Sequence, residues 1–214
     1  HPYDSNTIIG FGKDIIETAN GPVVGGIKIA MFDVSDVSKP VEKSKILLGS
    51  SGSYSEVLYN HRALLFSKDK DLFALPVMLY SGSGTGNRFS FQGAYVYSVN
   101  PSTGFVLRGT STHLTQPEID DSALKWYDTS KNVSRIIWSG SRLYTISDYG
   151  IKSHDLATMA EKGFMNPQKR PTLSDTGWGI AFLSSCCFKP GLKPCYPAHH
   201  IIPVPLYGIK SAYR

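Results

Sequence analysis

Apolar and polar residues alternate in several short stretches of this chain, and residues that favour turns separate the stretches. The clearest example covers residues 26–36, where the alternation predicts a half-buried strand and Asp33, Ser35 and Asp36 then predict a sharp turn. Residues 41–49 return as a second strand, so the two strands form a predicted hairpin. The same pattern predicts further strands over residues 6–12, 61–66, 72–79, 91–99, 105–110, 133–138, 141–147 and 150–156.

The spacing of these strands favours a repeated all-β architecture. Strand pairs recur roughly every 20 to 25 residues, and two pairs give a unit of roughly 40 to 50 residues, which is the size of one β-propeller blade. A β-sandwich also contains many short strands, so the spacing alone leaves that alternative open. Residues 61–66 and 72–79 are almost continuously apolar, which predicts strands buried on both faces. Glycines predict a loop over residues 20–26, and residues 111–132 lose the alternation, so a solvated connection is expected there.

The composition agrees with turn-rich β structure. The 214 residues include 20 Gly, 13 Pro and 12 Tyr, and only 18% are charged, which disfavours a helical bundle. No run of about 18 apolar residues occurs, so no membrane span is predicted. No basic segment followed by an apolar one precedes the first strand, so an export signal is not expected within this sequence.

The net charge of +5 comes entirely from the end of the chain. Residues 1–166 contain 16 Lys and Arg against 16 Asp and Glu, whereas residues 167–214 contain six basic residues against Asp175 alone. Because the β region is neutral and has no basic stripe interleaved with aromatics, nucleic-acid binding by it is not expected.

Three short stretches resemble ligand-binding loops without completing the pattern. Gly10-Phe11-Gly12 precedes another strand, whereas a dinucleotide loop opens a helix, so a bulge or bend is predicted. Residues 80–87, predicted to be a surface loop, lack the Gly-Lys-Ser/Thr ending of a phosphate-binding loop, and residues 117–122 lack the ligand spacing and central Gly of a calcium loop. We therefore expect no nucleotide cofactor and no calcium ion at these places.

Several single residues are candidates for chemistry, and each also has a structural interpretation. His61 is expected to be a hydrogen-bonded structural residue rather than a general base. Asp33 and Asp36 are expected to cap a turn rather than to bind calcium. Glu56 could act with the carboxylates of residues 69–71 as a hydrolase pair. The aromatics that could line a recognition surface, or serve as core partners, are Trp126, Tyr127, Trp138 and Tyr149.

The end of the chain, residues 166–214, is predicted to be an irregular, Pro-rich and Cys-rich tail. Adjacent cysteines rarely ligate one metal ion together, so a metal site is not expected, and a disulfide would leave one thiol unpaired. The residues concerned are Cys186, Cys187, Cys195, His199 and His200.

Four ordered blocks of this sequence carry a resemblance to a known family. The blocks are His1-Pro2-Tyr3-Asp4 with residues 7–13, residues 26–36, residues 59–66, and residues 142–147 with 151–152 and 155–156. Together they resemble, over about residues 1–165, a family of secreted bacterial and archaeal β-propeller proteins that are distantly related to WD repeats. Asn60 departs from that pattern, because an acidic residue is expected before His61.

The resemblance implies an all-β fragment of a propeller, with about three four-stranded antiparallel blades over residues 1–165, located on the cell surface or outside the cell. It implies no reaction, so no catalytic, cofactor-binding or metal-binding residue is expected. We expect a non-catalytic module that binds protein or glycan, and the alternative is a hydrolase that acts on surface polymers through loop carboxylates. A three-bladed section leaves open edge strands, so the missing blades or another copy of the chain are expected partners.

Overall fold

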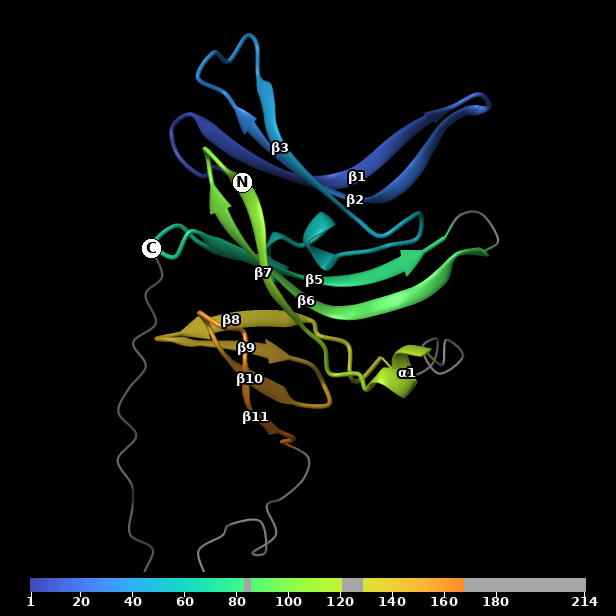
Figure 1. Cartoon of the computed structure of the whole chain (residues 1–214), viewed down its shortest axis with the longest axis vertical. Helices are drawn as coiled ribbons and strands as arrows, with labels where there is room; N and C mark the ends of the chain where they lie inside the picture. The colour runs from blue at the N-terminus through green and yellow to red at the C-terminus, as the bar shows by residue number, and fades with distance from the viewer. Residues whose placement is uncertain (83–85, 121–128, 168–214) are drawn as a thin grey trace, which may run out of the picture. The chain divides into compact units, whose positions relative to one another are not determined.

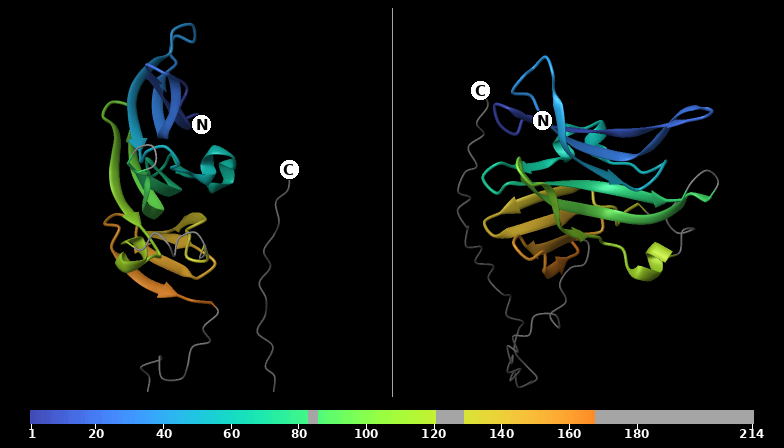
Figure 2. Two further views of the ribbon diagram at one scale, coloured as in Figure 1. Left: turned by 90° about the vertical axis from the view of Figure 1, so that its right-hand side faces the viewer. Right: turned by 45° about the horizontal axis from the view of Figure 1, so that its top comes forward.

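Three antiparallel β-sheets make up most of the regular structure (Figure 1). The computed structural model describes residues 1–82, 86–120 and 129–167, which belong to one unit spanning His1–Arg170. Within this unit the sheets follow one another in chain order, and the views of Figure 2 show the sheet of β4–β7 between the other two. The predicted tail, with all three cysteines, His199 and His200, lies outside the described residues apart from its first two positions.

The first sheet has three strands in the order β1-β2-β3, one fewer than predicted. They are β1 (Thr7–Thr18), β2 (Gly21–Asp33) and β3 (Val41–Leu48). The loop predicted over residues 20–26 is wrong, because β1 and β2 extend to a tight turn at residues 19–20. Gly26 lies inside β2, where an added Cβ would come within 2.4 Å of the Gly49 carbonyl oxygen. This glycine therefore permits close backbone approach and does not form a turn.

The turn after β2 forms as the sequence predicts. The Asp33 carboxylate accepts a hydrogen bond from the Ser35 amide at 3.0 Å, and the Asp36 carboxylate accepts one from the Ser38 amide at 3.0 Å. These bonds lower the pKa of Asp33, mainly through the Ser35 amide, and the Ser38 hydroxyl and amide do the same for Asp36. The prediction that both aspartates cap this turn is confirmed.

The second sheet has four strands in the order β4-β5-β6-β7. They are β4 (Leu65–Ser67), β5 (Leu72–Ser81), β6 (Arg88–Asn100) and β7 (Gly104–Ser111). The strand predicted over residues 61–66 is correct only at residues 65–66, because a 3₁₀ turn, η2 (His61–Ala63), occupies its first half. Another 3₁₀ turn, η1 (Glu56–Leu58), precedes it. β5 is buried along most of its length, as its apolar sequence predicts.

The third sheet also has four strands, in the order β11-β10-β9-β8. They are β8 (Arg135–Ser139), β9 (Arg142–Ile146), β10 (Ile151–Asp155) and β11 (Glu161–Met165). The sequence pattern predicts the first three of these and misses β11, whose five residues are all exposed. A short helix, α1 (Gln116–Asp120), lies in the stretch expected to be irregular.

Two apolar cores join the sheets in sequence. One core contains Ile27, Ile29 and Met31 of β2 together with Phe73 and Leu75 of β5. The other contains residues of β5 and β6 together with residues of β8 and β9, including Ala74, Val96, Ile136 and Leu143. The middle sheet is thus covered on both faces, and each sheet packs its apolar face on the next, as successive propeller blades do.

No helix in the described ranges is long and apolar enough to cross a membrane.

Candidate functional site

The connection from β3 to β4 carries a group of polar and aromatic side chains. It is fixed to the edge of β5 because Tyr54 and Met78 exchange two backbone hydrogen bonds, of 2.7 and 2.8 Å. The buried Ser55 hydroxyl donates to the Pro76 carbonyl oxygen at 2.6 Å. Ser55 also accepts a bond from the Val57 amide, so it begins η1. These contacts attach the backbone at Tyr54 and Ser55 to β5.

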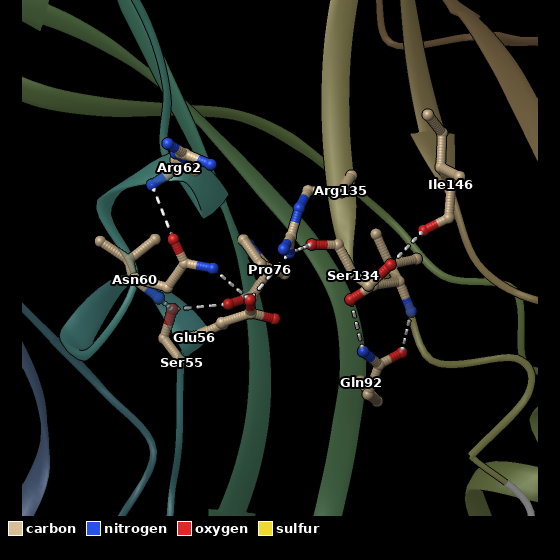
Figure 3. Close-up of polar contacts among 11 residues, drawn as sticks. Ser55, Glu56, Asn60, Arg62, Pro76, Gln92, Ser134, Arg135 and Ile146 are labelled. Carbon is tan, nitrogen blue, oxygen red and sulfur yellow. Dashed lines mark hydrogen bonds and ion pairs between the residues drawn. The ribbon is translucent and has the colours of Figure 1, made fainter.

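Glu56 is the central group of this cluster (Figure 3). Its Oε1 atom accepts a hydrogen bond from the Asn60 side-chain amide at 2.8 Å and lies 2.9 Å from Arg135 Nη1. Arg135 begins β8 and also donates to the Ser134 carbonyl oxygen at 2.7 Å. The carboxylate is therefore bound by a cation from the third sheet and by an amide from its own connection. Such an arrangement fixes the orientation of the polar groups.

Asn60 has a clear structural role at the position where the resemblance led us to expect an acidic residue. Its side-chain oxygen accepts a hydrogen bond from the Arg62 amide at 3.1 Å, so Asn60 caps the start of η2. Its side-chain amide nitrogen donates a hydrogen bond to Glu56. An aspartate could cap the same turn but could not donate to a carboxylate. The asparagine thus fits this cluster better than an acid would.

A small cavity lies beside the cluster. It measures about 170 Å³ and is lined by Glu56, Gln92, Asn132 and Ser134 among others. Gln92, on β6, is buried and forms two hydrogen bonds with the backbone of Val133, of 3.0 and 3.1 Å (Figure 3). These bonds fix the loop that leads into β8, so the cavity wall is shared by the second and third sheets.

Two tyrosines extend this site to the surface. The rings of Tyr54 and Tyr59 stack with their centroids 5.9 Å apart and their planes 17° apart. Both side chains are open to solvent, with exposed fractions of 44% and 81%. An exposed, oriented pair of aromatic rings offers a flat apolar surface with polar tips, which suits contact with sugars or peptides. Sequence reasoning missed both residues, because their pairing depends on the backbone between them and on the β5 edge.

Glu56 and Asp71, two carboxylates of the hydrolase pair suggested by the sequence, have different partners. Glu56 follows Ser55, which is bonded to Pro76, whereas Asp71 directly precedes the start of β5 at Leu72. Five residues of extended strand separate these two attachment points by about 16 Å. Asp71 instead accepts a hydrogen bond from the Tyr3 hydroxyl at 2.6 Å.

The prediction of a hydrogen-bonded structural role for His61 is wrong. His61 is exposed, and its ring has no hydrogen bond within the described part of the chain. His61 lies in η2 rather than in a strand, because the Asn60 side chain caps a 3₁₀ turn at this place. Its ring helps to line a cavity of about 450 Å³ that also contacts His1 and Phe11.

The aromatic residues named from the sequence do not gather at one place. Tyr149 stacks on Phe164 of β11 with centroids 5.5 Å apart, so it supports the third sheet. Trp138 is partly buried and lies 5.6 Å from Lys70 Nζ. Trp126 and Tyr127 fall outside the described residues.

A second polar cluster is buried between the middle and third sheets. The two ring nitrogens of His113 lie 2.7 Å from the Ser147 hydroxyl and 2.9 Å from the Thr145 hydroxyl. His154 Nε2 lies 2.8 Å from the Ser111 hydroxyl, which in turn lies 3.2 Å from that of Thr145. Burial, assisted by the positive charge of a nearby lysine, lowers the pKa of His113 to about 4, and burial lowers the pKa of His154 as well. Both rings are therefore neutral near pH 7 and act as structural hydrogen-bonding groups.

No group of three or more His, Cys, Asp and Glu side chains is arranged for a metal ion within residues 1–82, 86–120 and 129–167. In the acidic stretch before residue 122, Glu118 pairs with Lys131 and accepts bonds from Thr115. The Lys131 ammonium, together with the Thr115 amide, lowers the pKa of Glu118 to about 2. This carboxylate closes the start of α1, a role that differs from calcium binding.

Comparison with known families agrees with the three stacked sheets. The model of a family described as "Beta propeller domain" matches residues 1–159 of this chain. The chain belongs to the beta propeller domain family. The three sheets of this beta propeller domain are accordingly its blades, with β1–β3 as the first, β4–β7 as the second and β8–β11 as the third.

One relative of this beta propeller domain is an uncharacterized protein of Archaeoglobus fulgidus. The two are 36% identical over 76 residues, which represent 36% of this chain and 10% of the relative. The chain therefore matches only a small part of the relative's length, and the similarity carries no information about an activity.

Proposed function

We propose that this beta propeller domain is a non-catalytic binding module of a secreted or cell-surface protein, and that its partner is a protein or a glycan. The observation that carries this proposal is the exposed stack of Tyr54 and Tyr59 beside the charge-paired Glu56. Aromatic rings contact the apolar faces of sugars and peptides, while neighbouring amide and charged groups bind their polar atoms. The secreted location and a distant relation to WD repeats belong to this proposal and rest on the sequence resemblance.

Binding explains the local chemistry better than hydrolysis does. A hydrolase of the carboxylate type needs one acid that can donate a proton and a second carboxylate close to it. Glu56 is instead paired with Arg135 and Asn60, and Asp71 belongs to the other end of β5. The cluster thus supplies fixed hydrogen-bonding groups around an apolar platform, and these features favour recognition.

Replacement of Tyr59 tests the proposal directly. The protein would be applied to an array of microbial surface polysaccharides and purified surface-protein ectodomains, and affinity would be measured for each ligand retained. Tyr59→Ala removes an exposed ring without opening a core, so we expect at least a tenfold loss of affinity with an unchanged unfolding midpoint. Tyr59→Phe keeps the stacking ring and is the matched control, with affinity within about threefold of the parent protein.

Three results would contradict the proposal. The first is retention of no ligand at all, and the second is equal affinity for the parent protein and Tyr59→Ala. The third is chain shortening of a retained polysaccharide, which would support the hydrolase alternative.

A further inference from the structure

Tyr54 connects the exposed tyrosine pair with the small cavity that the second and third blades share. Its ring stacks on that of Tyr59, and the same residue lines the cavity of about 170 Å³. Its backbone exchanges hydrogen bonds of 2.7 and 2.8 Å with that of Met78, so Tyr54 is fixed in place. A ligand that lies on the tyrosine pair therefore has the cavity within reach of its next group.

The cavity has the size of one substituent rather than of a whole ligand. Its volume corresponds to about six water molecules, whereas pockets that enclose a whole small molecule measure about 300 to 1,000 Å³. Much of its wall is apolar, and the residues that form this apolar wall are Pro76, Val77, Met78 and Val133. The cavity can therefore take up a small, partly apolar group of a larger molecule.

Two polar groups beside the apolar wall have hydrogen-bonding capacity left. Glu56 uses its Oε1 atom for the two contacts described above, and no hydrogen bond of its Oε2 atom is found among the described residues. The side-chain amide of Asn132 likewise forms no hydrogen bond within the described part of the chain. Gln92, in contrast, uses both ends of its amide on the backbone of Val133. The cavity thus offers an acceptor at Glu56 and both a donor and an acceptor at Asn132.

The charges around the cavity suit an uncharged group. Among the described residues that line it, Glu56 alone carries a charge, and Arg135 compensates that charge at 2.9 Å. A charged ligand group would lose its hydration there without gaining an unpaired opposite charge. An acetamido group fits these surroundings, because its N–H donates, its carbonyl oxygen accepts and its methyl group is apolar.

The tyrosine pair favours a sugar over a peptide as the carrier of this group. A peptide that adds a strand to a sheet needs a free strand edge, and at Met78 the edge of β5 is already paired with Tyr54. A proline-rich peptide needs a groove lined by aromatic rings, whereas Tyr54 and Tyr59 stack on each other, so no groove lies between them. The exposed face of a single ring suits the apolar face of a pyranose.

We propose that this site recognises a glycan that contains 2-acetamido sugars, with one sugar ring on Tyr59 and the acetamido group of a neighbouring ring in the cavity. The acetamido N–H donates to Glu56 Oε2, its carbonyl oxygen accepts from the side-chain amide of Asn132, and its methyl group packs on the apolar wall. This inference rests on the proposed function and assigns its ligand to one chemical class.

Three soluble oligosaccharides with the same backbone test this inference on the full chain. They are the β-1,4-linked tetramers of N-acetylglucosamine, of glucosamine and of glucose, which differ from one another at the C2 substituent. Titration calorimetry should show at least about tenfold tighter binding of the N-acetylated tetramer than of the other two, because hydrogen bonds and a methyl contact are added.

Two variants separate the cavity from the tyrosine pair. Asn132→Leu has a side chain of similar size without the amide, so the preference for the N-acetylated tetramer should fall to within about threefold, while the affinity for the glucose tetramer stays unchanged. Tyr59→Ala should weaken the binding of all three tetramers by a similar factor, because it removes the ring on which each of them lies. Unchanged unfolding midpoints show that both variants keep the fold.

Equal affinities for the three tetramers, a preference for the glucosamine tetramer, or an unaltered preference in Asn132→Leu would overturn the inference and leave the proposed binding function intact. Binding of none of the three tetramers would overturn the inference as well. In that case, a surface protein or another glycan that the array retains through Tyr59 would still support the proposed function, whereas retention of no ligand would overturn both.

Discussion

At the scale of single residues, local interactions could be predicted from the sequence and long-range ones could not. Asp33 and Asp36 cap a turn through residues two positions further along the chain, and this pattern is visible in the sequence. Glu56 forms an ion pair with Arg135, which lies 79 positions further along the chain, and no local sequence pattern indicates that contact. His61 was expected to be held by hydrogen bonds, yet the fold leaves its side chain exposed. Sequence reasoning thus located the turn correctly and named Glu56, but it missed the Arg135 contact and the pair of Tyr54 and Tyr59.

Acid should destabilise the domain through its buried histidines. In the unfolded chain His113 has a pKa near 6.5, and in the folded domain burial lowers it to about 4. The unfolded state therefore takes up a proton first as the pH falls, and stability that is full above about pH 6.5 is lost towards pH 4. We expect His113 to contribute a loss on the order of 3 kcal/mol, with a further loss in the same direction from His154.

Urea unfolding at about pH 7 and about pH 4.5 measures this effect. The His113→Asn variant is expected to be less stable at neutral pH and to show a smaller difference between the two conditions. His61→Ala, at an exposed position, should retain the full pH dependence of the parent protein. An unchanged pH dependence in His113→Asn would show that other groups cause the acid sensitivity.

At the scale of elements, strands with a buried face could be predicted and exposed or polar elements could not. β5 is apolar throughout and buried, so its pattern is unambiguous. β11 has no buried residue, and alternation cannot reveal a strand whose two faces are both exposed. The short helix α1 had one local signal, the Thr115 and Glu118 spacing, whose hydrogen bonds close its first turn. The loop predicted up to Gly26, where the predicted strand of residues 26–36 begins, is wrong because a glycine needed for close approach and one needed for a turn look identical in the sequence.

Gly26→Ala tests the close approach of β2 and the segment after β3. An added Cβ would lie 2.4 Å from the Gly49 carbonyl oxygen and 2.5 Å from that of Leu48, so the backbone must shift. We expect a loss of about 2 to 3 kcal/mol in the free energy of unfolding. Gly12→Ala is the matched control in β1, where an added Cβ meets no atom within 4 Å. It should leave stability unchanged or raise it by up to about 1 kcal/mol. Equal losses in the two variants would contradict the close packing at Gly26.

At the scale of the whole described unit, the stacking of blades followed from hairpin spacing and from the family resemblance. The sequence predicted four-stranded blades, and the second and third blades have four strands while the first has three. Strand spacing alone left a β-sandwich as an alternative fold, because the number of strands does not specify which sheets face each other. The two apolar cores show which sheets face each other, because one core joins the first and second blades and the other joins the second and third.

Nuclear Overhauser contacts between side-chain methyl and aromatic groups test this order of stacking most directly. Contacts are predicted between Ile29 of the first blade and Phe73 or Val99 of the second, within the first core. Others are predicted between Val96 of the second blade and Leu143 of the third, within the second core. Contacts that join Ile29 directly to Leu143 would place the first and third sheets face to face, and such a result would contradict the propeller arrangement.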